Sequence, residues 1–307
     1  MEINVTRGGM LTTVQDLGRP GHRASGVPLS GAMDAFALRV ANLLAGNAEN
    51  TAALECTLVG PELVFSADTV VALGGAEFDG LSTWQPKVMR AGERLNLGAT
   101  QRGARGYLAI AGGFEVTPVL GSRSTYLRAG FGGFQGRALR DGDVLTAPDV
   151  ARHMSDHWRI DARILPAYSA SPTVRVVRGA QLDDFGAALF EAEFKILPQS
   201  DRMGIRLGGS KLARIGAVEL VSSAVAPGTV QVPADGQPIV LMADAQTIGG
   251  YPQAAHVISV DMPLVAQLRA GDRVRFTEVS LEEAQQLALA RDHVLAMLHE
   301  GLNEKFR

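Results

Sequence analysis

The polar residues best suited to chemistry lie between Gln231 and Pro252, in the stretch QVPADGQPIVLMADAQTIGGYP. Its apolar run, Ile239 to Met242, leads directly into polar side chains and two adjacent glycines. Binding sites often form at such a strand end, because glycine lets the backbone approach a ligand and present N–H groups to anions. We therefore predict a site formed by Gln231, Gln237, Asp244, Gln246, Thr247, Gly249, Gly250 and Tyr251.

A second cluster, QSDRMG at residues 199–204, sets an acid next to an arginine. Asp201 and Arg202 are followed by Gly204, and this combination can hold an anion or a carboxylate through charge-assisted hydrogen bonds. The same two side chains can instead form an internal ion pair at the start of a strand. The sequence leaves both alternatives open.

A third cluster, TTVQDLGR at residues 12–19, mixes polar and apolar residues without a period. Gln15, Asp16 and Arg19 lie between a predicted strand and the helix that we expect to begin near Met33. A hydrogen-bonded turn network explains this pattern, and a binding role is the alternative.

Several familiar kinds of site are missing from the sequence. His153 and His157 have helical spacing but no third ligand nearby, so we predict no metal site. The chain contains neither a P-loop nor a G-x-S-x-G nucleophile elbow. Cys56, the single cysteine, cannot form an internal disulfide and reads as a small buried hydrophobic residue.

The elements that must position these residues are mostly short strands. Apolar runs bounded by Gly, Pro and Asp, such as 69–73, 107–110 and 238–242, are typical of β-strands. Helical spacing predicts helices over Met33–Ala45 and Leu182–Glu191. A third helix is expected from Ser280, which forms an S-x-x-E capping box with Glu283.

Three segments of the first half are similar to segments of the second half, in the same order. RAGERLNL (90–97) matches RAGDRVRF (269–276), INVTRGG (3–9) matches VRVVRGA (174–180), and VVALGGA (70–76) matches IVLMADA (239–245). The preserved order favours an internal duplication. The turn-rich segment 153–172 reads as the linker, so we predict two small barrels or sandwiches, each with a helix.

Composition limits the class of protein. The 307 residues are 46% hydrophobic, with a net charge of −3, which suits a globular chain and gives no reason to expect nucleic acid or an anionic membrane as partner. The N-terminus lacks the pattern of a signal peptide, and no apolar stretch is long enough to span a bilayer. A cytoplasmic location is therefore expected.

The clusters also carry a family resemblance. It rests on TTVQDLGR (12–19), SGAMD (30–34), GSRST (121–125), SDRMG (200–204), QVPADGQPIVL (231–241) and DAQTIGGYP (244–252). These motifs resemble the family that comprises biotin-dependent carboxyltransferases, the second subunit of allophanate hydrolase and the C subunit of 5-oxoprolinase. The resemblance runs from Gly9 to about Glu283, and SLEEA (280–284) fits the 5-oxoprolinase branch.

This resemblance implies a mainly β fold of two cyclophilin-like β-barrel domains, over 1–152 and 173–279, with the linker at 153–172 and a C-terminal helix at 280–307. It implies the A and B subunits as partners and ATP-dependent cleavage of 5-oxo-L-proline to L-glutamate. ATP, accompanied by Mg²⁺, would phosphorylate the unreactive lactam carbonyl so that water can open the ring.

Roles for the residues follow from the resemblance. Asp201, Arg202 and Asp244 are the expected catalytic residues, with Arg202 clamping a carboxylate or phosphate and Asp244 orienting the lactam N–H or a metal-bound nucleotide. Gln246, Thr247 and the Gly249–Gly250 backbone would hold phosphate oxygens. The remaining expected binding residues are Tyr251, Gln231 and Gln237, with Gln15, Asp16 and Arg19 as their counterpart in the first half.

Two other functions remain open. One is a carboxyltransferase similar to that of urea carboxylase, although this chain has no A-M-K-M-type biotinylation segment and would need biotin on another protein. The other is a non-catalytic regulator that binds a B-like inhibitor of a histidine kinase.

Overall fold

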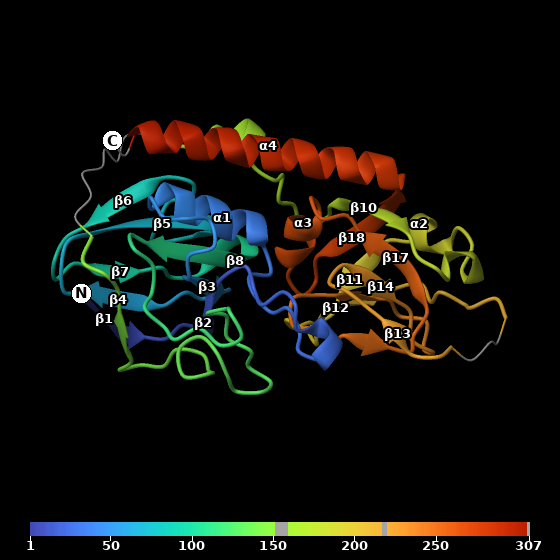
Figure 1. The fold of residues 1–307 in the computed structure, drawn as a ribbon. Helices are drawn as coiled ribbons and strands as arrows, with labels where there is room; N and C mark the ends of the chain where they lie inside the picture. Colours follow the sequence, from blue (N-terminus) through green and yellow to red (C-terminus); the bar gives the residue numbers. More distant parts are fainter. Residues whose placement is uncertain (151–158, 217–219, 306–307) are drawn as a thin grey trace. The chain divides into compact units, whose positions relative to one another are not determined.

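The computed structural model describes residues 1–150, 159–216 and 220–305. The chain forms two compact units (Figure 1). Unit 1 contains Met1–Arg19, Ser30–Pro166 and His293–Arg307, and unit 2 contains Pro20–Leu29 and Ala167–Asp292. The fold is mainly β, as the sequence predicts.

Unit 1 is built on a four-stranded and a five-stranded antiparallel sheet. The four-stranded sheet has the order β7-β4-β1-β9, and the five-stranded sheet has the order β2-β3-β8-β5-β6. The strands are β1 (Glu2–Arg7), β2 (Leu11–Gln15), β3 (Ala53–Thr57), β4 (Glu62–Phe65), β5 (Thr69–Phe78), β6 (Pro86–Met89), β7 (Arg94–Asn96), β8 (Thr100–Ile110) and β9 (Val144–Thr146).

The five-stranded sheet of unit 1 is covered on both faces. Successive side chains of a strand point to opposite faces, so Leu108 and Ile110 of β8 join one core with the four-stranded sheet. Tyr107 and Ala109 point the other way and join a second core with α1 (Ala35–Leu44). This two-sided burial explains why β5 and the second half of β8 are almost continuously buried.

Helix α1 confirms the helix predicted over Met33–Ala45. It begins after Asp34, whose Oδ1 accepts the N–H of Ala37 (2.9 Å) as an N-cap. Gly46, at φ +73°, follows its last turn. The sequence motif SGAMD is thus the entry into this helix.

Unit 2 contains a closed barrel with the order β10-β17-β14-β15-β12-β11-β18. The strands are β10 (Thr173–Arg178), β11 (Phe194–Ile196), β12 (Gly204–Gly208), β14 (Thr229–Gln231), β15 (Ile239–Leu241), β17 (Gln253–Val257) and β18 (Arg273–Glu278). A parallel pairing of β10 with β18 closes the barrel. Alternate residues of these two strands, including Val174 and Phe276, are buried inside it.

The remaining elements of unit 2 are short. β13 (Ser223–Ala224) pairs with β16 (Ile248–Gly249), and α3 (Met262–Ala266) follows β17. The continuous helix predicted over Leu182–Glu191 is wrong. A 3-10 turn, η3 (Leu182–Asp184), and the short helix α2 (Ala188–Glu191) occur instead, because Gly186 between them takes φ +57°.

The C-terminal helix α4 (Leu281–Lys305) confirms the helix expected from Ser280. The Ser280 hydroxyl accepts the N–H of Glu283 (3.0 Å), as a capping box requires. Residues up to Asp292 belong to unit 2 and those from His293 onward to unit 1.

Part of the predicted linker over 153–172 is packed on unit 1. Residues 153–158, which include His153 and His157, lie outside the described residues. The Ile160 side chain is buried in the α1 core, and its N–H donates to Trp84 O (3.1 Å). The 3-10 turn η2 (Ala162–Ile164) follows directly.

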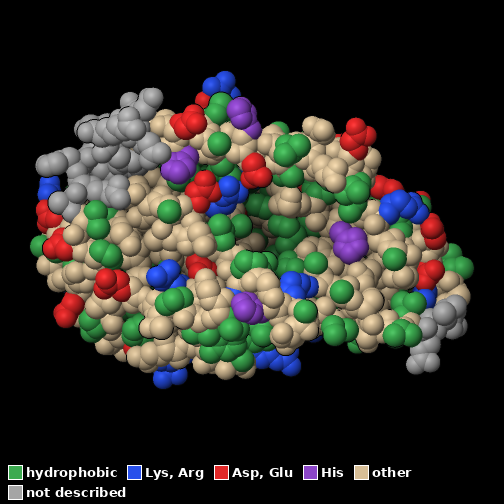
Figure 2. Space-filling view, viewed as in Figure 1, with side chains coloured by type: hydrophobic (Ala, Val, Ile, Leu, Met, Phe, Trp, Pro, Cys, Tyr) green, Lys and Arg blue, Asp and Glu red, His purple; other side chains and the backbone are tan. Residues whose placement is uncertain are grey.

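The surface carries both signs of charge. Among the described residues visible in Figure 2, acidic and basic side chains are interspersed. Of the helices in the described residues, none is long and apolar enough to cross a membrane.

Candidate functional site

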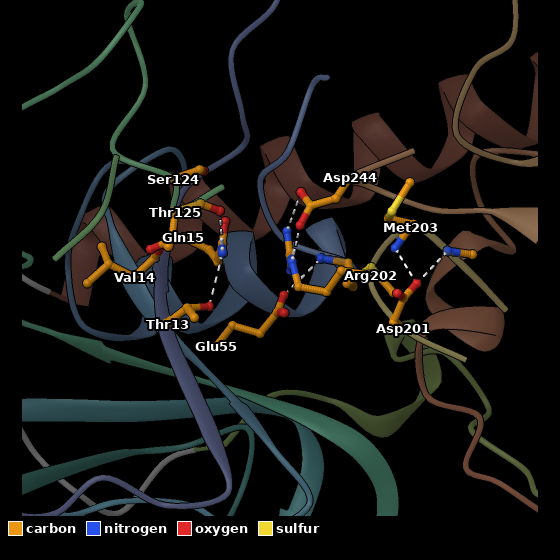
Figure 3. A network of polar contacts seen from close by, with 12 residues as sticks. Thr13, Val14, Gln15, Glu55, Ser124, Thr125, Asp201, Arg202, Met203 and Asp244 are labelled. Atoms are coloured by element: carbon orange, nitrogen blue, oxygen red, sulfur yellow. Dashed lines mark hydrogen bonds and ion pairs between the residues drawn. The ribbon is translucent and has the colours of Figure 1, made fainter. Parts of the chain in front are cut away.

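Arg202 and Asp244 form a buried ion pair in unit 2 (Figure 3). Arg202 Nε donates to Asp244 Oδ2 (2.8 Å), and Nη2 donates to Oδ1 (3.1 Å). The two residues are only 5% and 4% exposed. Sequence analysis placed them in separate clusters, and the structure brings them together.

The pairing of β12 with β15 positions these two side chains. Gly204 opposes Leu241 in the antiparallel ladder, so the residues before β12 lie opposite those after β15. The backbone continues this pairing, since the Asp244 N–H donates to Arg202 O (2.9 Å). A site at one end of the barrel wall therefore follows from the strand register.

The bidentate geometry holds the Arg202 guanidinium in a fixed plane. Such pairs are among the stronger hydrogen-bonded contacts in proteins, but removing both charges from water offsets much of the gain. Truncating one partner would leave a buried charge uncompensated, at a cost of roughly 3–5 kcal/mol. The pair can orient a ligand only as a unit, because Asp244 is already committed to Arg202.

Asp201 has a different position from its neighbour. Its side chain is exposed, and Oδ1 accepts the N–H groups of Met203 (2.8 Å) and Gly204 (3.2 Å). These contacts cap the turn that starts β12. Asp201 thus shapes the entry to the strand, and its predicted catalytic role finds no supporting contact in the described part of unit 2.

The predicted residues after Asp244 gather around Gln231, a buried residue at the end of β14. Gln246 Nε2 donates to Gln231 Oε1 (3.3 Å), and Gln231 Nε2 lies 3.5 Å from Tyr251 O. A Cβ on Gly249 would lie 2.6 Å from Gln231 Nε2, so any larger residue there would displace the Gln231 amide.

The residues of this loop differ in how open they are. Gln246 and Gly250 are exposed, and Tyr251 is 50% exposed. Thr247 is buried, and its carbonyl accepts the Val225 N–H (3.1 Å). The loop therefore combines a fixed backbone with side chains that a ligand can reach.

Gln237 makes a structural contact within unit 2. Its side chain accepts the Gly209 N–H at Oε1 (3.1 Å) and donates from Nε2 to Gly209 O (3.3 Å). This pair of hydrogen bonds joins two loops as a strand neighbour would. Among the described residues, the structure gives Gln237 no contact with the Arg202–Asp244 pair.

In unit 1, Asp16 is the centre of a hydrogen-bonded network. Its carboxylate accepts the hydroxyls of Ser122 (2.6 Å) and Ser124 (2.5 Å) and the N–H groups of Gly18 (2.8 Å) and Arg123 (2.6 Å). The network joins the motifs TTVQDLGR and GSRST, which are far apart in the sequence. A turn network, the first alternative from the sequence, therefore accounts for Asp16.

Gln15 and Arg19 lie in the same region of unit 1 and are fully buried. Gln15 Nε2 donates to Thr13 Oγ1 (3.0 Å) and Thr125 O (3.2 Å), as Figure 3 shows. Arg19 donates from Nη2 to Ser124 O, and its guanidinium carbon lies 4.9 Å from the centre of the Phe131 ring. Both side chains hold the 124–131 segment in place.

Sequence analysis missed a second buried network in unit 1. Tyr107 donates its hydroxyl proton to Glu55 Oε2 (2.8 Å) and accepts the Asp34 N–H (2.8 Å). The Met33 N–H also donates to Glu55 Oε2 (2.9 Å). The available signal was Glu55 itself, a carboxylate within the apolar strand run LECTL.

Burial changes the ionisation of two groups in this region. Desolvation, followed by the charges of Glu55 and Asp34, raises the pKa of Tyr107 well above its usual value. Desolvation likewise raises the pKa of the Cys56 thiol, with Glu55 adding to the effect. Cys56 is fully buried and stays protonated, which confirms that it is a core residue.

The described residues contain no ready-made cluster of metal ligands. Within them, no group of three or more His, Cys, Asp or Glu side chains is placed to hold a metal ion. Magnesium commonly takes its ligands from substrate phosphates and water as well as carboxylates. The described residues alone therefore give Mg²⁺ no preformed cage.

The fold and these clusters define a class of protein with two β units, one of them holding a closed barrel, and polar motifs converging within each unit. The family of the carboxyltransferase domain, subdomain A and B, matches residues 25–278. The chain belongs to this family.

Relatives extend over nearly the whole chain. The C subunit of 5-oxoprolinase from Escherichia coli (strain K12) is 43% identical over 292 residues, which cover 92% of this chain and 93% of that protein. The corresponding 5-oxoprolinase protein of Haemophilus influenzae is 39% identical over 308 residues, covering 95% of this chain and 96% of that protein.

A solved structure supports the same family assignment. The urea amidolyase of K. lactis superimposes with a TM-score of 0.90 at 30% identity. The match covers 97% of this chain but 20% of that one, so this chain spans about a fifth of the larger protein.

Proposed function

We propose that this chain is the C subunit of an ATP-dependent 5-oxoprolinase, which acts with the A and B subunits to convert 5-oxo-L-proline to L-glutamate. The observation that carries the proposal is the 43% identity to the E. coli C subunit over 93% of that protein's length. A match to almost the whole of a relative supports an equivalent part in the same assembly. We also propose that this chain is located in the cytoplasm.

The chemistry needs a group that activates the lactam. An amide carbonyl is a poor electrophile, and transfer of a phosphoryl group from ATP to its oxygen makes the carbon reactive toward water. The ring C–N bond then breaks with the amine as leaving group, and hydrolysis of the resulting acyl phosphate releases L-glutamate and phosphate. The residues of this chain would bind and orient the reactants, as positioning and charge stabilisation dominate phosphoryl transfer. Arg202, held in plane by Asp244, suits the carboxylate of 5-oxoproline or a phosphate.

The loop after Asp244 would hold the other part of the ligand. Gln246 is exposed beside the buried Gln231, and the exposed Gly250 has no Cβ to block a close approach to its backbone. These groups suit phosphate oxygens or the lactam amide, both of which accept hydrogen bonds. Mg²⁺ would come with ATP, bound chiefly through phosphate oxygens and water.

Substitution of the ion pair tests this assignment. Asp244→Asn and Arg202→Ala should lower 5-oxoproline-dependent ATP turnover of the A–B–C mixture at least about a hundredfold, because each removes a charge-assisted contact and disturbs its partner. Arg206→Ala, which alters an exposed arginine of β12, is the matched control and should retain activity.

Gel filtration and circular dichroism of each variant separate loss of folding from loss of function. Asp244→Asn keeps the shape of the side chain and gives the cleaner result. Turnover near that of the unaltered chain in both ion-pair variants would contradict the assignment of the site.

The second candidate function is a biotin-dependent carboxyltransferase. It is favoured by the similarity to the urea amidolyase of K. lactis across 97% of this chain. An assay for carboxyl transfer from carboxybiotin to an amide acceptor would reveal it. Binding of a partner without either activity would instead favour the regulator.

A further inference from the structure

A glycine-rich loop in unit 1 lines a pocket of about 410 Å³. The loop, Gly130–Gly136, reads GFGGFQG and faces Glu115, Val116, Thr117 and Val119 across this pocket. None of these residues belongs to the site proposed in unit 2, and the loop follows closely after the GSRST motif in the sequence.

The backbone of this loop is held in an unusual conformation. Gly132, Gly133, Gln135 and Gly136 all have positive φ, at +70°, +54°, +56° and +68°. A Cβ on Gly133 would lie 1.8 Å from Thr125 Oγ1, so the loop is packed tightly against its neighbour. Its shape is therefore set before any ligand arrives.

Four successive amide groups of the loop have no acceptor within the part of the chain that the structure describes. Within the described residues, the N–H groups of residues 132–135 donate no hydrogen bond. The next two N–H groups do, since that of Gly136 donates to Gly132 O (2.8 Å) and that of Arg137 donates to Phe134 O (3.3 Å). Backbone N–H groups are strong hydrogen-bond donors, and Gln135 at the end of this run is exposed. Successive N–H groups form concavities that bind anions where right- and left-handed backbone alternate, and Phe134 stands between the positive-φ residues Gly133 and Gln135.

A positive side chain lies beside the pocket. Arg123 donates from Nε to Val116 O (3.2 Å), and Val116 lines both this pocket and another of about 660 Å³ that Arg123 also lines. Among the described residues, no carboxylate pairs with the Arg123 guanidinium. Glu115 is exposed and lines both pockets, and its charge is opposite in sign to that of Arg123.

Asp16 fixes the segment that carries Arg123. Its carboxylate accepts the Arg123 N–H (2.6 Å) together with the hydroxyls of Ser122 and Ser124 on either side. The buried network thus restrains the arginine's backbone, which lowers the entropy lost when an anion binds. Asp16 is a positioning residue in this arrangement.

We propose that the Gly130–Gly136 loop and Arg123 form a phosphate-binding site in unit 1. A phosphate group offers several acceptor oxygens to a row of N–H donors, and the planar guanidinium of Arg123 adds a charge-assisted contact. The identification of ATP as the molecule that carries this phosphate rests on the proposed function. The phosphate site itself does not depend on that function.

Titration of the whole chain, labelled with ¹⁵N-glycine and ¹⁵N-phenylalanine, tests the site by NMR. Inorganic phosphate and ATP should shift the amide signals of Gly132, Gly133 and Phe134 in a saturable manner. Adenosine, which has no phosphate, should leave them unchanged, and acetate should act only weakly. Unmoved signals at millimolar phosphate and ATP, or equal effects of acetate, would overturn the proposal.

Substitution of Arg123 gives a second readout. Arg123→Gln should weaken phosphate binding about tenfold, as expected for loss of a charge-assisted hydrogen bond. Arg140→Gln, at another exposed arginine of unit 1, should bind as the unaltered chain does, and Arg123→Lys should keep most of the affinity. Unchanged affinity in Arg123→Gln would refute the assigned role of this arginine.

These measurements use the chain by itself, so they are independent of lactam turnover. Phosphate binding without 5-oxoproline-dependent ATP turnover by the A–B–C mixture would uphold this site and reject the proposed function. Turnover without phosphate-dependent shifts at the loop would reject this site and uphold the proposed function.

Discussion

At the scale of single residues, Asp16 and Asp244 show two ways of holding a buried carboxylate. Asp16 is balanced by four neutral donors, whereas Asp244 is balanced by one arginine. Neutral donors fix the position of a carboxylate but leave its negative charge uncancelled, whereas an arginine cancels that charge. The Asp16 network therefore serves to fix a loop, and the bidentate contact with Asp244 fixes the plane of the Arg202 guanidinium.

Tyr107→Phe should destabilise unit 1 by about 2 kcal/mol, since it leaves the Asp34 N–H without its acceptor and removes a donor from Glu55. Urea denaturation at neutral pH measures this loss. Ile248→Ala, at an exposed side chain of unit 2, is a control that should change stability little.

The same tyrosine predicts a dependence on alkaline pH. The pKa of Tyr107 is raised well above 10.0 in the folded chain, so above that pH the unfolded chain loses a proton that the folded chain keeps. The stability from this group is complete below pH 10.0 and falls as the pH rises beyond it. Tyr107→Phe should show a shallower alkaline loss, and an unaltered slope would contradict this account.

At the scale of elements, one kind of turn recurs at three places in the described residues. In Arg90–Glu93, Arg140–Asp143 and Arg269–Asp272, the fourth residue's N–H donates to the first carbonyl, and its acidic side chain accepts the first N–H. Each has glycine in third place with positive φ. The repeated octamer of the sequence thus begins with a turn, and RDGD at 140–143 forms the same turn in unit 1.

Glycines of unit 2 differ in the reason they are needed. Gly271 takes φ +97° with nothing within 4 Å of a built Cβ, whereas a Cβ on Gly179 would lie 2.1 Å from Gln253 O. Gly271→Ala should therefore cost about 1 kcal/mol from backbone conformation alone. Gly179→Ala should cost about 3 kcal/mol, because the clash is with backbone that cannot move freely.

Thermal denaturation of both variants provides the measurement. The two substitutions add the same methyl group, so each serves as the control for the other. Equal losses of stability in the two variants would contradict this distinction between a left-handed backbone and a close approach of another backbone segment.

At the scale of the whole molecule, sequence order and compact units do not coincide. Pro20–Leu29 belongs to unit 2 although unit 1 surrounds it in the sequence, and Arg23 within it donates to Val225 O. Helix α4 begins in unit 2 and contributes its last residues to unit 1. The chain therefore passes between the units several times, and a fragment cut at one point in the linker would lack part of each unit.

Leu295→Ala tests the contribution of α4 to unit 1. This side chain is fully buried in the core with α1, so the substitution should cost about 3 kcal/mol through lost burial and a cavity. Met297→Ala, two residues further on and 53% exposed, should change stability by less than about 0.5 kcal/mol. Comparable losses in chemical denaturation would mean that α4 does not complete this core.

The sequence by itself determined the features that depend on local pattern. The strands around 69–73, 107–110 and 238–242, helix α1, the cap at Ser280 and the buried state of Cys56 follow from periodicity, turn residues and capping chemistry. The family also follows from linear motifs, because motifs keep their order along the chain. Where one glycine changed the local backbone, at Gly186, the pattern alone predicted too long a helix.

Only the tertiary structure decided which polar residues meet. Arg202 finds Asp244 through the register of two strands, and Asp16 finds Ser122 and Ser124 across a long stretch of sequence. The Glu55–Tyr107–Asp34 contacts depend on which face of β3 and β8 turns toward α1. Such partners are set by strand pairing and packing between distant segments, and no local pattern records them.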